Sequence, residues 1–240
     1  MLLNRSHWDE KDVVEYEKYL FSLSKGEEKG EWEKRIANTS LPCIAVPSED
    51  VRRISAEIFK GDYRSFLTLA PQNNYSEVAV VGNIISKIKD FGEFSAELEP
   101  YGKAADCWAS VDILKFNKKR FGERLFLLGD DYIHRPLTFE RRIGLRIMFS
   151  FIDSEHLDYI FETAQELIGE KEYYVNMCLA WLLAECVVKR RDETMAFLER
   201  AELSDFVLRK TVSKCRDSYR VSAEDKDTLK RLLIFKLRRE

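Results

Sequence analysis

The sequence predicts an all-α protein, built as a curved solenoid of antiparallel helix pairs with about a dozen helices in total. Apolar residues recur at helical spacing through most of the 240 residues, with polar breaks between the apolar stretches. No alternation of period two persists long enough to indicate a strand. Helix pairs that repeat every 40–47 residues or so are typical of HEAT-like arrays, in which each pair buries its apolar side against its neighbours. A globin-like or orthogonal bundle is the alternative.

Caps, glycines and prolines predict the helices of the first half. Asp9 or Asp12 can begin a helix that runs to Leu20. A polar break over residues 26–30 precedes a helix around residues 32–36. Two prolines favour an extended segment over residues 41–46, because proline lacks an amide hydrogen and restricts the residue before it. Further helices are expected from Ser48 to Gly61, from Ser76 through Ile88, from Phe91 to a stop at Pro100, and from a cap at Asp106 to Asn117.

The second half is predicted to continue in the same way. A helix over residues 118–128 is followed by a turn at the Gly-Asp-Asp-Tyr sequence of residues 129–132. Residues 172–188 are strongly apolar and must be largely buried. Caps for the other helices are expected at Thr138, Ser154, Asp192, Ser204 and Ser222. Because no linker interrupts the chain, we expect residues 1–240 to form a single domain, with residues 1–40 as its N-terminal helices.

The composition argues against several classes of protein. No apolar run approaches the roughly 20 residues needed to cross a bilayer. Residues 1–9 lack the apolar core and cleavage site of a signal peptide, so we expect a cytoplasmic protein. The three histidines are scattered, and the five cysteines are widely separated without a C-x-x-C pair. Neither a disulfide framework nor a metal site is therefore expected.

The net charge of −3 at pH 7 does not by itself suggest a nucleic-acid-binding protein. The charge is unevenly distributed, however. Basic residues outnumber acidic residues from Trp181 to Glu240, and acidic residues are in excess before Trp181. Affinity for phosphates follows the local field, so a basic face on an acidic protein is compatible with DNA binding.

Four residues at three places along the chain carry candidate chemistry. Trp108 and Asp112 are four residues apart and therefore lie on one face of a helix. Arg142 and Trp181 follow, each about one HEAT-like repeat further along, so all four could line one layer of a solenoid. Two indoles, a carboxylate and a guanidinium suit a ligand that is both flat and charged, such as DNA with a damaged base.

At these positions the sequence resembles AlkD-type DNA alkylation-repair glycosylases. The resemblance covers the chain from about residue 35 to the C-terminus. Five segments carry it, namely Ala45-Val46-Pro47-Ser48-x-x-Val51-Arg52-Arg53, Trp108-x-x-x-Asp112, Arg142-Ile143-Gly144-Leu145, Tyr173-Tyr174-Val175-Asn176-Met177-x-x-Ala180-Trp181, and Lys214-Cys215-Arg216-Asp217-Ser218-Tyr219-Arg220-Val221. The family's tyrosine on an early helix falls near Ile36, with Trp32 close by.

The resemblance implies a HEAT-like solenoid that grips duplex DNA and hydrolyses the N-glycosidic bond of cationic N3- or N7-alkylated purines. It assigns Asp112 to stabilising the oxocarbenium-like sugar and positioning water. It assigns Trp108 and Trp181 to packing on the deoxyribose of the lesion. It assigns Arg142 to a backbone phosphate, with Arg141 as the alternative. The enzyme expected from it is monomeric, uses no metal or organic cofactor, and works in a bacterial cytoplasm.

Further basic residues could follow the DNA phosphates. These are Lys115, Lys118, Lys119, Lys189, Arg190, Arg191, Arg216 and Arg220. Each also fits an ordinary solvated helix face, and residues 189–191 suit a helix C-terminus through the helix dipole. Two other functions remain open: a HEAT-like protein that binds damaged or branched DNA without excision, and a scaffold that binds a peptide partner on its concave face.

Overall fold

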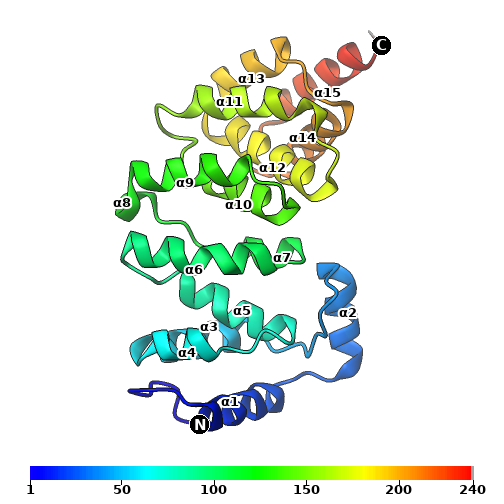
Figure 1. The fold of residues 1–240 in the computed structure, drawn as a ribbon. Coiled ribbons are helices and arrows are strands. Elements are labelled where there is room, and N and C mark those ends of the chain that lie inside the picture. The colour runs from blue at the N-terminus through cyan, green and yellow to red at the C-terminus, as the bar shows by residue number, and fades with distance from the viewer. Residues whose placement is uncertain (239–240) are drawn as a thin grey trace. The chain divides into compact units, whose positions relative to one another are not determined.

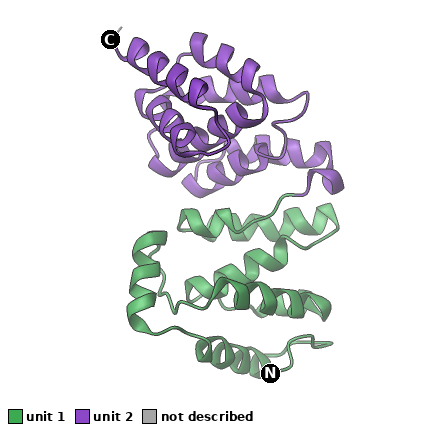
Figure 2. Cartoon of the chain, turned by 180° about the vertical axis from the view of Figure 1, so that it is seen from behind, with its two compact units in different colours: residues 1–116 green, residues 117–240 purple. Residues whose placement is uncertain are grey.

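In the computed structural model, residues 1–238 are described, and they form fifteen α-helices and one 3-10 helix without a strand (Figure 1). The prediction of an all-α protein is confirmed. Arg239 and Glu240, which belong to the basic C-terminal segment, lie outside the described residues. The chain divides into two compact units, residues 1–116 and residues 117–240 (Figure 2). The organisation of residues 1–240 as a single domain stays a prediction.

Unit 1 holds the first seven helices. They are α1 (Glu10–Ser22), α2 (Glu27–Ala37), α3 (Ser48–Lys60), α4 (Tyr63–Leu69), α5 (Tyr75–Ile85), α6 (Phe91–Ala104) and α7 (Trp108–Asp112). Helix α1 begins at a capping box, in which Asp12 N donates to Asp9 Oδ1 (2.9 Å) and Asp9 N donates to Asp12 Oδ2 (3.3 Å). Helix α4 was not predicted from the sequence.

An aromatic cluster forms the core between α1 and α4. Trp8, Tyr16 and Phe66 are each fully buried and pack edge to face, with ring centroids 4.9–6.3 Å apart. Helix α3 packs on α5, and α5 packs on α7. The Ser55 hydroxyl joins α3 to α5 by donating to the Val80 carbonyl (3.2 Å). This layer of three helices presents the Trp108 segment.

Two predicted helix breaks in unit 1 are wrong. Helix α2 begins at Glu27 and contains Gly30, where a Cβ atom would lie 2.2 Å from the Cys43 carbonyl oxygen. This glycine allows a close approach of two backbone segments, so it is not a break. Helix α6 continues through Pro100 to Ala104. The last turn of α6 is held by Tyr101, which is buried and donates its hydroxyl hydrogen to the Ser110 carbonyl (2.9 Å).

Unit 2 holds the remaining described helices. They are α8 (Lys118–Phe121), α9 (Glu123–Ile133), α10 (Thr138–Met148), α11 (Leu157–Glu166), the 3-10 helix (Leu167–Gly169), α12 (Tyr173–Lys189), α13 (Arg191–Arg200), α14 (Asp205–Asp217) and α15 (Ala223–Leu237). The predicted caps Ser204 and Ser222 accept hydrogen bonds from Val207 N and Asp225 N. Thr138, Ser154 and Asp192 were expected to cap α10, α11 and α13, but these helices are capped by Leu137, His156 and Arg190.

The turn predicted at residues 129–132 is wrong, because this sequence lies inside α9. Gly129 and Gly144 let α9 and α10 pack closely: a Cβ atom on Gly144 would lie 2.6 Å from the Gly129 carbonyl oxygen and 2.5 Å from Ile133 N. Beyond this contact, α10 packs on α12 and α12 packs on α14. This second layer carries the arginine and tryptophan predicted for the site. No helix in residues 1–238 is long and apolar enough to span a membrane.

Candidate functional site

The four residues predicted for the site divide between the two units. Trp108 and Asp112 begin and end α7 in unit 1, whereas Arg142 lies on α10 and Trp181 on α12 in unit 2. Their convergence on one surface stays a prediction.

Trp108 is half-buried and is held by a polar contact. Its indole Nε1 donates a hydrogen bond to the Ile36 carbonyl oxygen of α2 (3.2 Å). This differs from a core tryptophan such as Trp8, which is fully buried among aromatic rings. The contact explains why the indole keeps a defined orientation while part of its surface stays accessible.

Asp106 fixes both segments that meet at Trp108. It was expected to cap the helix, but Cys107 occupies that position. The Asp106 carboxylate instead accepts hydrogen bonds from Thr39 Oγ1 (2.6 Å), Ser40 N (2.7 Å) and Ser40 Oγ (2.8 Å), which follow α2. Burial acts to raise the pKa of Asp106, but these hydrogen bonds outweigh it and hold the pKa below its usual value. The start of α7 is thereby tied to the end of α2.

Asp112 is half-buried at the end of α7 and lies in an acidic part of unit 1. Burial, reinforced by nearby negative groups that include Glu33 and Asp112, raises the pKa of the Tyr75 phenol. Burial also raises the pKa of Glu33, although that carboxylate accepts a hydrogen bond from Ala45 N (3.1 Å). Glu33 and Tyr75 line a hollow of about 220 Å³ that also reaches Lys115.

Both predicted arginines make contacts within unit 2, and Arg142 is almost completely excluded from solvent. Arg142 is 5% exposed and donates from Nη1 to the Tyr174 carbonyl (2.7 Å), which joins α10 to α12. Arg141 forms an ion pair with Glu170 (2.9 Å) and donates to the carbonyls of residues 135 and 136. Both arginines hold elements of unit 2 together.

Trp181 is half-buried, with two cations against its ring. The Arg146 guanidinium carbon lies 4.7 Å from the Trp181 ring centroid, and Lys214 Nζ lies 5.8 Å from it. The Phe149 ring meets the indole edge to face, with centroids 4.7 Å apart. Indole faces attract cations through their quadrupole. Arg146 and Lys214 were missed from the sequence, although Arg146 lies one helical turn beyond Arg142 and so shares its face of α10.

The other predicted cations differ in the contacts that they make. Most are paired with carboxylates, which leaves them less available to phosphates: Lys189 with Asp153, Arg190 with Glu193, Arg191 with Asp192 and Asp225, Arg216 with Asp217, and Arg220 with Glu185. Lys118 lies over the Phe151 ring at 4.9 Å. Lys115 and Lys119 are exposed and form no ion pair with any residue in the described part of the chain.

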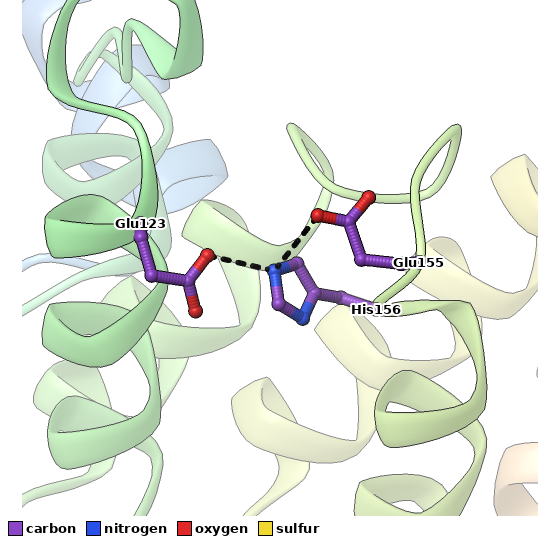
Figure 3. A group of neighbouring side chains, drawn as sticks. All are labelled: Glu123, Glu155 and His156. Carbon is purple, nitrogen blue, oxygen red and sulfur yellow. Dashed lines mark hydrogen bonds and ion pairs between the residues drawn. The ribbon is translucent and has the colours of Figure 1, made fainter.

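One group of side chains in residues 1–238 has the spacing of metal ligands (Figure 3). His156 Nε2 lies 3.0 Å from Glu123 Oε2 of α9 and 3.9 Å from Glu155 Oε1. The imidazole stacks on Phe126, with centroids 3.8 Å apart. Both carboxylates are largely exposed to solvent. The contacts join the segment before α11 to α9.

Comparison with known proteins identifies the family. Residues 10–215 match the model of the family described as DNA alkylation repair enzyme. No curated protein matches the chain significantly. A solved structure described as a predicted DNA alkylation repair enzyme from Enterococcus faecalis shares the fold, with a TM-score of 0.65 and 13% sequence identity over 82% of this chain and 99% of that chain. With the family model covering most of its length, the chain belongs to the DNA alkylation repair enzyme family.

Proposed function

We propose that this protein is a DNA glycosylase that releases cationic N3- and N7-alkylated purines from duplex DNA. The observation that carries the proposal is that its two predicted site tryptophans are partly exposed and contact polar or cationic groups. Trp108 and Trp181 lie on α7 and α12 of a family member, and each is half-buried and held by polar or cationic neighbours. Such indoles keep accessible surface for a ligand, whereas a core tryptophan does not.

The proposed reaction requires mainly electrostatic stabilisation from the protein. An alkylated purine carries a positive charge and leaves as a neutral base, so it needs no general acid. The enzyme must stabilise positive charge on the sugar and place a water at C1′. A carboxylate at Asp112 does both, by charge complementarity and by accepting a proton from the water. Indole faces at Trp108 and Trp181 add an attraction for the cationic sugar.

Arg146 replaces Arg142 in this proposal as the arginine that meets a backbone phosphate. Arg142 donates to Tyr174 within unit 2 and is 5% exposed, whereas Arg146 is half-buried beside Trp181. Lys214, on the next helix of the same layer, also lies against Trp181. Two cations beside the indole would neutralise phosphates that flank a sugar packed on its face.

The test is release of 7-methylguanine and 3-methyladenine from methylated duplex DNA, measured for the wild type and for Asp112→Asn. The variant keeps the shape of the side chain and removes its charge. We expect it to lower the rate about 100-fold to 1,000-fold, as loss of one transition-state stabiliser does. Asp227→Asn, on the exposed face of α15, is the matched control and is expected to retain the wild-type rate.

Three outcomes separate the hypotheses. No release above the spontaneous rate, with retained DNA binding, would favour a protein that recognises damaged DNA without excision. No binding to DNA at all would favour a protein–protein scaffold. Equal rates for the wild type and Asp112→Asn would remove Asp112 from the mechanism while leaving the glycosylase in place.

A further inference from the structure

His156 and two glutamates place three metal-ligand atoms around one point in unit 2. Glu123 lies in the first turn of α9, and Glu155 and His156 lie at the end of the segment before α11. Both carboxylates approach the same imidazole nitrogen, Nε2, with Glu123 Oε2 at 3.0 Å and Glu155 Oε1 at 3.9 Å (Figure 3). The three ligand atoms all lie within 4.8 Å of one another. None of these residues takes part in the proposed function.

An ordinary ion pair accounts for only one of the two carboxylates. A ring nitrogen carries at most one hydrogen, and the nearer acceptor for it is Glu123. The Glu155 oxygen lies beyond hydrogen-bond distance of that nitrogen, and its negative charge is close to that of Glu123. Lys118 supplies some positive charge to Glu155, but its ammonium group lies over the Phe151 ring at 4.9 Å. A divalent cation would contact the nitrogen and both carboxylates together.

His134 shows a different arrangement of a histidine with two carboxylates. Its Nδ1 lies 3.4 Å from Asp130 Oδ1, and its Nε2 lies 3.8 Å from Glu166 Oε2. The carboxylates therefore approach different nitrogens, so an ion bound to the ring could meet only one of them. The convergence of both carboxylates on one nitrogen distinguishes His156 from His134.

The imidazole of His156 is held in place by aromatic packing. It stacks on Phe126, with centroids 3.8 Å apart and planes inclined by 11°, and it meets Phe151 edge to face at 5.5 Å. Its side chain is 16% exposed, whereas those of Glu123 and Glu155 are 58% and 82% exposed. A fixed ring and two exposed carboxylates can close around an ion by small movements of the glutamates, which keeps the cost of ordering low.

We propose that Glu123, Glu155 and His156 bind a zinc ion that fastens the segment before α11 to α9. Tetrahedral zinc with bonds of about 2.0–2.2 Å places its ligand atoms about 3.3–3.5 Å apart. The distances of 3.0 and 3.9 Å lie on either side of that spacing. A mixed set of imidazole and carboxylates favours Zn²⁺ over Ca²⁺ and Mg²⁺, which prefer oxygen ligands alone. Three protein ligands leave a fourth position for water.

The sequence gave no expectation of this site, because Glu123 and His156 are 33 residues apart and belong to different helical segments. The proposal is independent of glycosylase activity. Its consequence is structural: an ion that binds only the folded chain stabilises it, and the gain rises with zinc concentration.

Calorimetric titration of Zn²⁺ into the whole chain, first stripped of metal with a chelator, measures the site directly. Wild type is expected to bind one Zn²⁺ per chain and to melt at a higher temperature as zinc is added. Glu155→Gln and Glu123→Gln each remove one largely exposed ligand, so both are expected to fold and to bind zinc about tenfold or more weakly. His134→Gln is the matched control and is expected to bind zinc as the wild type does.

Cobalt in place of zinc reports which atoms bind. Nitrogen and oxygen ligands are expected to give visible absorption bands without the intense near-ultraviolet band of a cobalt–thiolate bond. A thiolate band would place the ion at a cysteine and overturn this site. Absence of zinc binding by the wild type, or unchanged affinity in both glutamate variants, would overturn it too. Each of these outcomes leaves the proposed function standing, because release of methylated purines is measured separately.

Discussion

Two arginines one turn apart on α10 are predicted to respond in opposite ways to substitution by methionine. Arg146 lies 4.7 Å from the rings of both Phe149 and Trp181 and is half-buried. Arg142 is 5% exposed and donates to the Tyr174 carbonyl at 2.7 Å. The first arrangement fits a cation that meets DNA, and the second fits an arginine that joins two helices.

The magnitudes follow from these contacts. In Arg146→Met, loss of one phosphate contact makes the plot of log affinity against log salt concentration shallower by about 0.9. The same variant loses two cation–π contacts, roughly 0.5–1 kcal/mol each in the free energy of unfolding. In Arg142→Met, the Tyr174 carbonyl loses its donor, at a cost of about 1–3 kcal/mol in stability. The salt slope of Arg142→Met is expected to match that of the wild type.

The assay is fluorescence anisotropy of a labelled duplex between about 50 and 200 mM salt, the range in which phosphate contacts dominate affinity. Each variant is first shown to be folded by circular dichroism, and its unfolding free energy is measured in urea. The result that would refute the reasoning is a shallower salt slope for Arg142→Met together with an unchanged slope for Arg146→Met.

Three other variants test the packing and the surface. Gly144→Ala should destabilise the protein by about 1–3 kcal/mol in urea unfolding, because the new Cβ atom would lie 2.5 Å from Ile133 N. Gly169→Ala is the control and should be nearly neutral, because a Cβ atom there would have no neighbour within 4 Å. Equal effects of the two substitutions would contradict the close packing of α9 on α10. Asp106→Asn should remove the part of the stability loss at low pH that protonation of Asp106 causes. The pKa of Asp106 in the folded state lies below its unfolded value, so its carboxylate stabilises the fold above about pH 4 and loses this effect as the pH falls further. Urea unfolding of the variant and the wild type at several pH values measures the difference. Lys119→Ala should weaken DNA binding and make the salt slope shallower by about 0.9 without changing the melting temperature; a wild-type slope would exclude a phosphate contact.

Local sequence patterns were sufficient for the class of fold and for the placement of several residues on their helices. Helical spacing of apolar residues predicted the all-α fold, and the caps at Ser204 and Ser222 are where the sequence placed them. Trp108 and Asp112 also lie on one helix, as predicted. In each case the signal lies within one or two turns of chain, where helix geometry alone decides which residues are neighbours.

Only the tertiary structure decided how several of these residues are used. Gly30 and Gly129 were interpreted as breaks, but they lie inside helices at points of close packing. Asp106 accepts hydrogen bonds from residues that follow α2 instead of capping α7. The predicted arginine Arg142 is buried, and Arg146 lies beside Trp181. These roles depend on contacts between residues far apart in the chain, which packing determines and local propensity does not encode.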